Sequence, residues 1–219
     1  MSEFILGNCM NYLKDYPDNY YGLAIVDPPF GGVTLGGYAK NKMTGGLAKH
    51  PKYNLSLWDQ NRPDRNYFTE IKRVSKNQII WGGNYFIDYL EPSQCWIVWD
   101  KIKDFNGCDF ADVELAFTSF NKASRIFRFQ WSGMLQGDMK NKEKRIHPTQ
   151  KPVRLYTWIL DNFAQKGDKI LDTHVGSASS LIACERMGYE YVGYEINEEY
   201  YKMASARLDE ERAQAKWQF

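Results

Sequence analysis

The chain has 219 residues, and its 28 Lys and Arg residues nearly balance its 27 Asp and Glu residues, so no overall charge indicates binding to nucleic acid. Its four cysteines form no Cys-x-x-Cys pair and match no zinc-ligand spacing, which argues against a metal site and favours a reducing compartment. The sequence shows no signal peptide and no apolar run of membrane-spanning length, so we expect a soluble, cytoplasmic protein without a membrane partner.

Apolar periodicity predicts alternating strands and helices along the chain. Strands are expected at residues 3–7, 21–26, 78–83, 95–100, 169–171 and 189–196. Helices are expected at residues 8–16, 63–74, 152–163 and 177–188, and from the N-cap Asn197 onward. Segments 112–120 and 123–131 are expected to form an antiparallel pair. This order predicts one α/β domain over 1–219, a doubly wound, mostly parallel sheet with helices on both faces.

Two segments are expected to contact a target. Residues 31–66, with several glycines and lysines, are expected to form a long loop, and loops of this length are usually functional. Residues 121–146, a predicted basic hairpin, carry seven Lys and Arg residues against two acids, with aromatic rings between them. This pattern suits contact with nucleic-acid backbone and bases, although a solvated hairpin would look the same. The candidate nucleic-acid contacts are Lys40, Lys42, Lys49, Arg125, Arg128, Lys142, Lys144 and Arg145.

The string Asp27-Pro28-Pro29-Phe30 follows the predicted strand 21–26. The two prolines fix two φ angles and remove two backbone donors, so the strand ends in a stiff tip with bare carbonyl oxygens. The Asp27 carboxylate and the Pro28 carbonyl are acceptors for the two N–H groups of an aromatic amine, and Phe30 can stack on its ring. The string therefore indicates alkylation of a ring amino group. A rigid turn with Phe30 packed inside is the alternative.

Two acids follow the last two predicted strands. Asp172 precedes a turn of small residues with Gly176 and Ser177 at a helix start, where backbone N–H groups attract anions. Glu195 ends the next strand, where nucleotide-binding α/β folds place an acid on the ribose hydroxyls. An ordinary strand–turn–helix and a solvated Glu195 are the alternatives.

The string His147-Pro-Thr149-Gln-Lys151-Pro lies just before a predicted helix. Between its two prolines it offers a rigid set of hydrogen-bonding groups for a zwitterionic ligand, with Lys151 or Thr149 on a carboxylate. We interpret His147 as structural because a lone histidine rarely indicates catalysis, and the sequence holds no Ser/His/Asp arrangement or phosphate-loop lysine.

Together these strings resemble the S-adenosylmethionine-dependent amino-methyltransferases of DNA, in the β-class order that places Asp-Pro-Pro-aromatic before the glycine motif. The string at 147–152 matches the family letter for letter, and the resemblance covers nearly the whole chain. It implies a Rossmann-like methyltransferase sheet, S-adenosylmethionine as cofactor, and double-stranded DNA with the target base flipped out. In that family the Asp-Pro-Pro-Phe form accompanies adenine N6 and a Ser-Pro-Pro form cytosine N4, so the resemblance implies an adenine-N6 enzyme of the restriction–modification kind.

The resemblance also implies roles for individual residues. It assigns catalysis to Asp27, Pro28, Pro29 and Phe30. It assigns cofactor contacts to Asn8, Cys9, Asp27, His147, Thr149, Lys151, Asp172, His174, Gly176, Ser177, Ala178, Glu195 and Ile196. Four positions depart from the family pattern: Asn8 replaces Asp, Thr173-His174 replace Pro-Phe, and Ala178 replaces the second glycine.

These departures leave alternatives open. One is a catalytically inactive, methyltransferase-like protein that binds nucleic acid, and the others are methylation of cytosine N4 or of adenine in RNA. A dinucleotide-dependent oxidoreductase is disfavoured because the glycine turn lacks the full dinucleotide pattern. The sequence leaves a homodimer, the recognition sequence and a cognate nuclease open.

Overall fold

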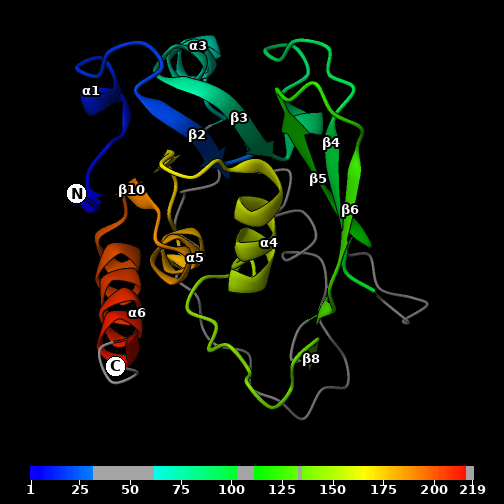
Figure 1. The fold of residues 1–219 in the computed structure, drawn as a ribbon, viewed down its shortest axis with the longest axis vertical. Coiled ribbons are helices and arrows are strands. Elements are labelled where there is room, and N and C mark those ends of the chain that lie inside the picture. Colours follow the sequence, from blue (N-terminus) through cyan, green and yellow to red (C-terminus); the bar gives the residue numbers. More distant parts are fainter. Residues whose placement is uncertain (32–61, 103–110, 133–134, 216–219) are drawn as a thin grey trace.

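The computed structural model describes residues 1–31, 62–102, 111–132 and 135–215. Strands within these residues are β1 (Glu3–Leu6), β2 (Tyr21–Val26), β3 (Ser75–Trp81), β4 (Trp96–Asp100), β5 (Val113–Thr118), β6 (Arg125–Arg128), β7 (Trp131–Ser132), β8 (Leu135–Gln136), β9 (Lys169–Asp172) and β10 (Glu190–Glu195). In the described part, eight of them form one sheet in the order β1-β10-β9-β2-β3-β5-β4-β6 (Figure 1). Neighbouring strands are parallel except where β5 pairs with β3 and β4, so the predicted mostly parallel sheet is confirmed.

Helices cover both faces of this sheet, as predicted. The helical segments are α1 (Met10–Leu13), α3 (Arg65–Val74), the 3₁₀ turn η2 (Gly83–Tyr85), α4 (Val153–Phe163), α5 (Ser179–Met187) and α6 (Glu198–Ala215). Helices α4, α5 and α6 pack into one hydrophobic cluster, whereas α1 and α3 pack into a second cluster on the opposite face. Within the described segments, no helix combines the length and the apolar character needed to cross a membrane.

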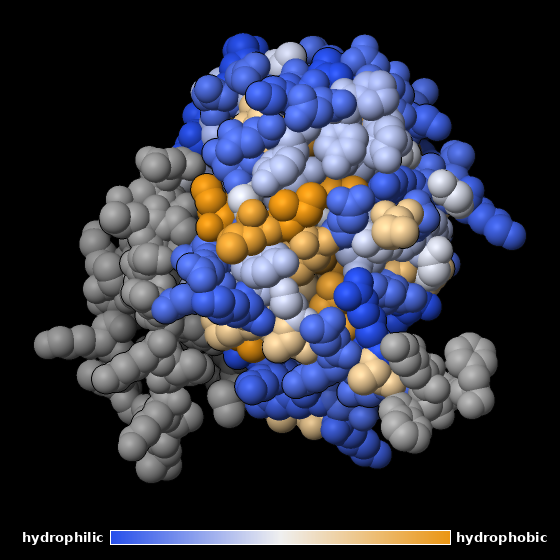
Figure 2. All heavy atoms as spheres, turned by 90° about the vertical axis from the view of Figure 1, so that its left-hand side faces the viewer, coloured by the Kyte–Doolittle hydropathy of each residue, from blue (hydrophilic) through white to orange (hydrophobic). Residues whose placement is uncertain are grey.

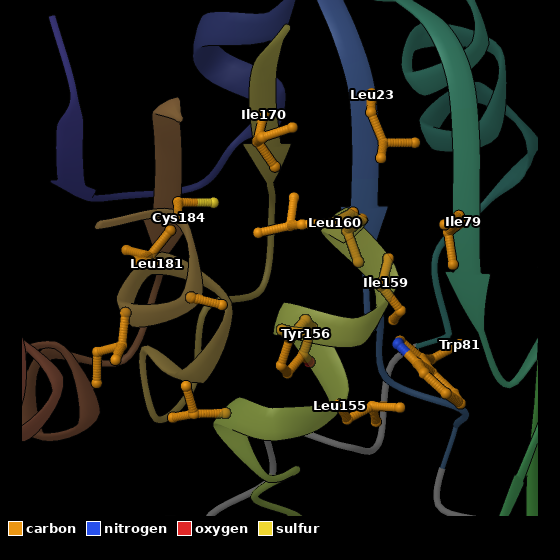
Figure 3. Packing of buried hydrophobic residues seen from close by; sticks show 14 of the residues in the cluster. Leu23, Ile79, Trp81, Leu155, Tyr156, Ile159, Leu160, Ile170, Leu181 and Cys184 are labelled. Atoms are coloured by element: carbon orange, nitrogen blue, oxygen red, sulfur yellow. The ribbon is translucent and has the colours of Figure 1, made fainter. Parts of the chain in front are cut away.

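Alternation along the strands decides which face each side chain joins. In β2, Leu23 and Ile25 belong to the cluster under α4 and α5, and Ala24 and Val26 belong to the cluster under α1 and α3. Figure 3 shows how Leu23 of β2, Ile170 of β9 and Leu160 of α4 gather in the first cluster. Complete burial of a side chain such as leucine contributes about 1.5–3 kcal/mol, so this layer fixes α4 on the sheet.

The same alternation directs the acids at the strand ends. Asp27 lies two residues after Ile25, and Asp172 lies two residues after Ile170, so both continue the series that faces α4 and α5. Their contacts agree, because Asp27 pairs with Lys151 just before α4 and Asp172 accepts a hydrogen bond from Ser180 of α5. Strand periodicity therefore brings acids distant in sequence to one side of the sheet.

The predicted antiparallel pairing of segment 112–120 with segment 123–131 is wrong. β5 lies between β3 and β4 and runs antiparallel to both, whereas β6 pairs in parallel with β4, with Trp99 opposite Phe127. The reason is burial: Ile97 and Trp99 are buried, so β4 gains from neighbours on both edges.

The helix ends follow local chemistry. The side-chain oxygen of Asn197 accepts hydrogen bonds from the backbone N–H groups of Glu199 (2.9 Å) and Tyr200 (3.1 Å), so the predicted N-cap of α6 is confirmed. The helix predicted over 8–16 is shorter, since α1 covers only Met10–Leu13. Gly188 closes α5 with a positive φ of 72°, as expected for a C-cap glycine.

Candidate active site

A cavity of about 510 Å³ opens at the carboxyl ends of β1, β10, β9 and β2. Its volume is within the range of small-molecule sites. It lies where β2 and β9 adjoin and the following helices pack on opposite faces, which is the usual ligand position in open α/β sheets. The predicted cofactor residues that line it are Asn8, Cys9, Asp27, His147, Thr149, Lys151, His174, Gly176, Ser177, Glu195 and Ile196. Of the remaining predicted residues, Pro29 lines the cavity, whereas Pro28, Phe30, Asp172 and Ala178 do not.

Glu195 is held rigidly at the end of β10. Its Oε2 accepts the backbone N–H of Gly176, and its Oε1 accepts the backbone N–H of Asn197, both at 2.8 Å. Gly176 has a φ of 56°, a left-handed conformation that favours glycine. Burial raises the pKa of Glu195, while the hydrogen bonds from the backbone oppose that rise. The carboxylate therefore reaches the cavity in a fixed orientation, with lone pairs left for a ligand.

Asp172 is buried behind the turn and supports it. Its two oxygens accept hydrogen bonds from the Ser180 hydroxyl and from the backbone N–H of His174 (3.0 Å). Burial raises its pKa to about 7, although both hydrogen bonds act in the opposite direction. Ala178, where the resemblance implies a second glycine, keeps a left-handed φ of 62° with a buried methyl group.

The Thr173-His174 pair is connected to helix α3. The Tyr67 hydroxyl lies 2.7 Å from Thr173 Oγ1, and that oxygen lies 2.9 Å from His174 Nδ1. The Tyr67 ring also meets the His174 ring edge-on, with centroids 5.5 Å apart. Burial lowers the pKa of His174 to about 4, so the imidazole is neutral at pH 7. Sequence reasoning missed Tyr67 because no local signal ties a helical tyrosine to a turn 106 residues away.

His147 is a packed, neutral side chain. Its ring lies against the Tyr200 ring, with centroids 4.3 Å apart, and its Nδ1 lies 3.1 Å from Thr149 Oγ1. Burial lowers the pKa of His147 to about 3, and the nearby Lys151 charge acts in the same direction. The imidazole therefore carries no charge at neutral pH, which agrees with a structural part in shaping the cavity wall.

Cys9 lines the cavity as a protonated thiol. It is buried, and burial raises its pKa to about 12. The neighbouring Asn8 uses its side-chain oxygen to accept the backbone N–H of Met10 at 3.0 Å, so its amide NH₂ group is the part left for a ligand. Tyr156 of α4 also lines the cavity and was missed from the sequence.

Lys151 lines the cavity and contacts the Asp27-Pro28-Pro29-Phe30 string. Its ammonium contacts a carboxylate oxygen of Asp27 and lies 3.2 Å from Glu114 Oε2. Burial alone would lower the pKa of Lys151, but the charges of Asp27 and Glu114 reverse that effect and raise it. Contact between Lys151 and a cofactor carboxylate stays a prediction. Glu114 was not singled out from the sequence because its importance depends on the position of β5 beside β3.

Phe30 packs away from the cavity. Its ring stacks on Tyr85 of η2, with centroids 4.9 Å apart and planes inclined by 25°, and meets the edge of Phe86 at 6.0 Å. It also lies directly on Gly82, where an added Cβ would come 2.1 Å from the ring. The turn after β3 therefore sets the position of the aromatic end of the Asp-Pro-Pro-Phe string.

We expect Gly82→Ala to lower the free energy of unfolding more than Gly188→Ala does. Both glycines have positive φ, 65° and 72°, so alanine costs about 1–2 kcal/mol of backbone strain at either position. At Gly188 an added Cβ meets no atom within 4 Å, whereas at Gly82 it meets Phe30, which adds about 1–3 kcal/mol of overpacking. Urea unfolding of both variants measures the difference, and equal losses would contradict the tight Phe30–Gly82 contact.

The structure does not bring all the predicted nucleic-acid contacts to one place. Arg128 ends β6 at the same sheet edge as the cavity and pairs with Asp100 at 3.3 Å, whereas Arg125 begins β6 at the opposite end. Lys142 and Lys144 are exposed, and Arg145 lies over the Trp131 ring at 4.6 Å. Lys40, Lys42 and Lys49, with most of the predicted loop 31–66, lie outside the described residues. Among the described residues, no group of three or more His, Cys, Asp or Glu side chains could hold a metal ion.

The rim of the cavity is partly apolar. Ile196, directly after Glu195, lines the cavity and is 63% exposed. Figure 2 shows the left-hand side of Figure 1, the side of β1, β10 and α6, where a band of hydrophobic residues crosses a mostly hydrophilic surface. Exposed apolar residues of these elements also include Leu6 and Met203. An apolar rim beside a fixed carboxylate suits a ligand with a flat ring and a polyhydroxyl group.

The doubly wound sheet, with a cavity lined by acids at its switch point, places the protein in the class of Rossmann-like α/β proteins. A family model described as DNA methylase (N6_N4_Mtase) matches residues 38–206. The chain belongs to this DNA methylase family.

Individual relatives agree with this assignment. The chain is 41% identical over 71 residues to the type II methyltransferase M.HpaI of Haemophilus parainfluenzae, a match covering 32% of the chain and 23% of that relative. It is 27% identical over 188 residues to the type II methyltransferase M2.DpnII of Streptococcus pneumoniae. This match covers 84% of the chain and 62% of that relative. The chain thus matches less than two thirds of the length of either relative. The structure of the M1.HpyAVI–SAM complex shares the fold, with a TM-score of 0.57, 16% identity, and coverage of 95% of this chain and all of that one.

Proposed function

We propose that this protein transfers a methyl group from S-adenosylmethionine to N6 of adenine in DNA. The observation that carries the proposal is the position of Asp27. Its carboxylate lines the same cavity as Glu195 and the Gly176 turn, so an acceptor for an amino group and a nucleotide-type site share one space. Membership of the DNA methylase family supports the same reaction class.

The cavity residues fit S-adenosylmethionine. The fixed Glu195 carboxylate suits two ribose hydroxyls, and the exposed Ile196 suits one side of the adenine ring. The acids in and behind the cavity favour a ligand with cationic groups, and both histidines there are neutral at pH 7. When bound, S-adenosylmethionine supplies an electrophilic methyl group on a sulfonium sulfur.

The Asp27-Pro28 tip fits the chemistry of an exocyclic amine. The nitrogen lone pair of such an amine is delocalised into the ring, which makes the nitrogen a weak nucleophile. Hydrogen bonds from its two N–H groups to the Asp27 carboxylate and the Pro28 carbonyl would favour a tetrahedral nitrogen and stabilise its developing positive charge. Lys151 holds the Asp27 carboxylate in place for this task.

A base paired within a duplex cannot reach this cavity, so the target adenine must leave the base stack. Arg128, at the end of β6 on the same sheet edge as the cavity, and the exposed Lys142 and Lys144 offer cationic groups that suit phosphate contacts. Adenine, rather than cytosine, is favoured because the string carries Asp27 where the cytosine-N4 form of the motif carries serine. Double-stranded DNA as the partner and a cytoplasmic location complete the proposal.

The proposal is tested with purified protein, S-adenosylmethionine labelled in its methyl group, and unmethylated duplex DNA, with RNA of matching sequence in a parallel reaction. We expect label to enter the duplex DNA. Label confined to RNA would overturn DNA as the substrate, and binding of S-adenosylmethionine without transfer to either nucleic acid would indicate a protein that has lost catalysis.

Affinity for S-adenosylmethionine is expected to fall as the pH is lowered from 8 to 6. Asp172 has a pKa of about 7, so below pH 7 it must lose a proton before it can favour a cationic ligand. If binding requires ionised Asp172, the affinity falls by roughly tenfold for each pH unit below the pKa of Asp172. Calorimetric titration across this range provides the measurement.

Asp172→Asn serves as the control for this pH dependence, because asparagine preserves the shape without a titrating group. The dissociation constant of this variant should be higher and nearly independent of pH between 6 and 8. An unchanged pH dependence in the variant would contradict the assignment to Asp172 and would point to Glu195, whose pKa burial also raises, since His147 and His174 remain neutral throughout the range.

A further inference from the structure

Four side chains of alternating charge form a continuous series that runs from the end of β4 to Asp27. Lys101, just after β4, lies 2.5 Å from Glu114 Oε1, and the other oxygen of Glu114 lies 3.2 Å from Lys151 Nζ. Lys151 in turn contacts Asp27. The Lys151 side chain is only 4% exposed, so its charge depends on these carboxylates rather than on water.

Each of the two lysines in this series also lies over one tryptophan ring. Lys101 Nζ lies 5.2 Å from the Trp99 ring, and Lys151 Nζ lies 5.2 Å from the Trp81 ring. Both tryptophans are fully buried, so the ammonium groups are bounded by rigid apolar surface as well as by carboxylates. This leaves Lys151 little freedom to move toward either acid.

Glu114 reaches this position by strand alternation. Ala116, two residues later in β5, belongs to the cluster under α4, so Glu114 faces the same side of the sheet as Asp27. Its two oxygens bind different lysines, which fixes the carboxylate plane. The charges of Lys151 and Lys101 lower the pKa of Glu114 to about 2 against the opposing effect of burial, so it is ionised at neutral pH.

Sharing Lys151 between two acids has a consequence for the reaction. An ammonium paired with one carboxylate places its full charge there and weakens that carboxylate as an acceptor for another N–H group. With Glu114 on the other side, Asp27 shares Lys151 and keeps more of its negative charge for the amino group. Glu114 also prevents Lys151 from drawing Asp27 out of its position at the cavity.

We propose that Glu114 is a positioning residue for methyl transfer, acting through Lys151 to fix the direction and the acceptor strength of Asp27. This inference rests on the proposed function and goes beyond it, because Glu114 lies in no motif and does not line the cavity.

The test begins with Glu114→Gln. We expect kcat for methyl transfer to fall by roughly 10- to 100-fold, the size of effect that a small misplacement of a catalytic group produces. The KM for S-adenosylmethionine should stay within about twofold of wild type, because Glu195 and the 172–178 turn are untouched. Glu114→Asp, which keeps the charge, should recover part of the loss. Glu91→Gln, which removes a carboxylate 3.5 Å from the exposed Lys72, is the matched control and should keep wild-type kcat.

A double-mutant cycle shows whether Glu114 acts through Lys151. In a Lys151→Met background, Glu114→Gln should cause no further loss of kcat, so the two effects should not multiply. Multiplicative losses, or an unchanged kcat in Glu114→Gln, would overturn the inference. If thermal denaturation shows that Glu114→Gln does not fold, the same cycle is run with Glu114→Asp. Absence of methyl transfer by the wild-type protein would instead overturn the proposed function itself, and this inference with it.

Discussion

Asp27→Ala is expected to reduce kcat for methyl transfer by about 10²- to 10³-fold, comparable to the loss of a group that stabilises charge in a transition state. The variant removes the strongest acceptor for the amino group and leaves only the Pro28 carbonyl. The fold should survive, because Lys151 keeps Glu114 as its partner. Single-turnover methylation with saturating S-adenosylmethionine measures the effect.

The control for this experiment is Asp161→Ala, which removes an exposed carboxylate from α4 and should leave kcat unchanged. The dissociation constant for S-adenosylmethionine in Asp27→Ala should remain close to that of wild type, because Glu195 and Asp172 are intact. An Asp27→Ala protein with near-normal kcat would contradict the catalytic role proposed for the Asp-Pro-Pro-Phe string.

Glu195→Gln is expected to weaken S-adenosylmethionine binding by roughly 100-fold, since hydrogen bonds to a charged group contribute about 1.5–3 kcal/mol each. The amide places an NH₂ group against one of the two backbone donors, Gly176 N–H or Asn197 N–H, and so disturbs the turn as well as the ribose contact. Once the variant is saturated, kcat should change little because Asp27 is unaffected.

Isothermal titration provides this measurement, and Glu190→Gln is the matched control. Glu190 begins the same strand but is exposed and paired with the N-terminus, so its replacement should leave binding unchanged. Equal affinity in Glu195→Gln and wild type would contradict the placement of the ribose at the end of β10.

Short-range patterns in the sequence were sufficient to predict the layers of the fold and the main acids. Asp172 and Glu195 each end a strand and Asp27 directly follows one, and strand alternation together with parallel pairing brings them to one edge and one face. The N-cap at Asn197 was equally predictable, because it depends on one side chain and the backbone next to it.

Features that depend on sheet order were not predictable. The pairing of β6 with β4 requires the chain to pass β5, and nothing in the alternation of residues 123–131 distinguishes that arrangement from a hairpin. The contact between Glu114 and Lys151 depends on the position of β5 beside β3, which the local sequence does not indicate. The packing of Phe30 on Gly82 and Tyr85 likewise arises from the turn after β3, 52 residues further along the chain from Phe30.

The most direct test of the account is the identity of the methylated nucleoside. Unmethylated duplex DNA is treated with the protein and S-adenosylmethionine, digested to nucleosides, and separated by mass spectrometry. We expect N6-methyladenine, formed about 10²- to 10³-fold more slowly when the Asp27→Ala protein is used. N4-methylcytosine would contradict the choice of adenine while preserving the reaction class, and the absence of any methylated nucleoside would contradict the central claim.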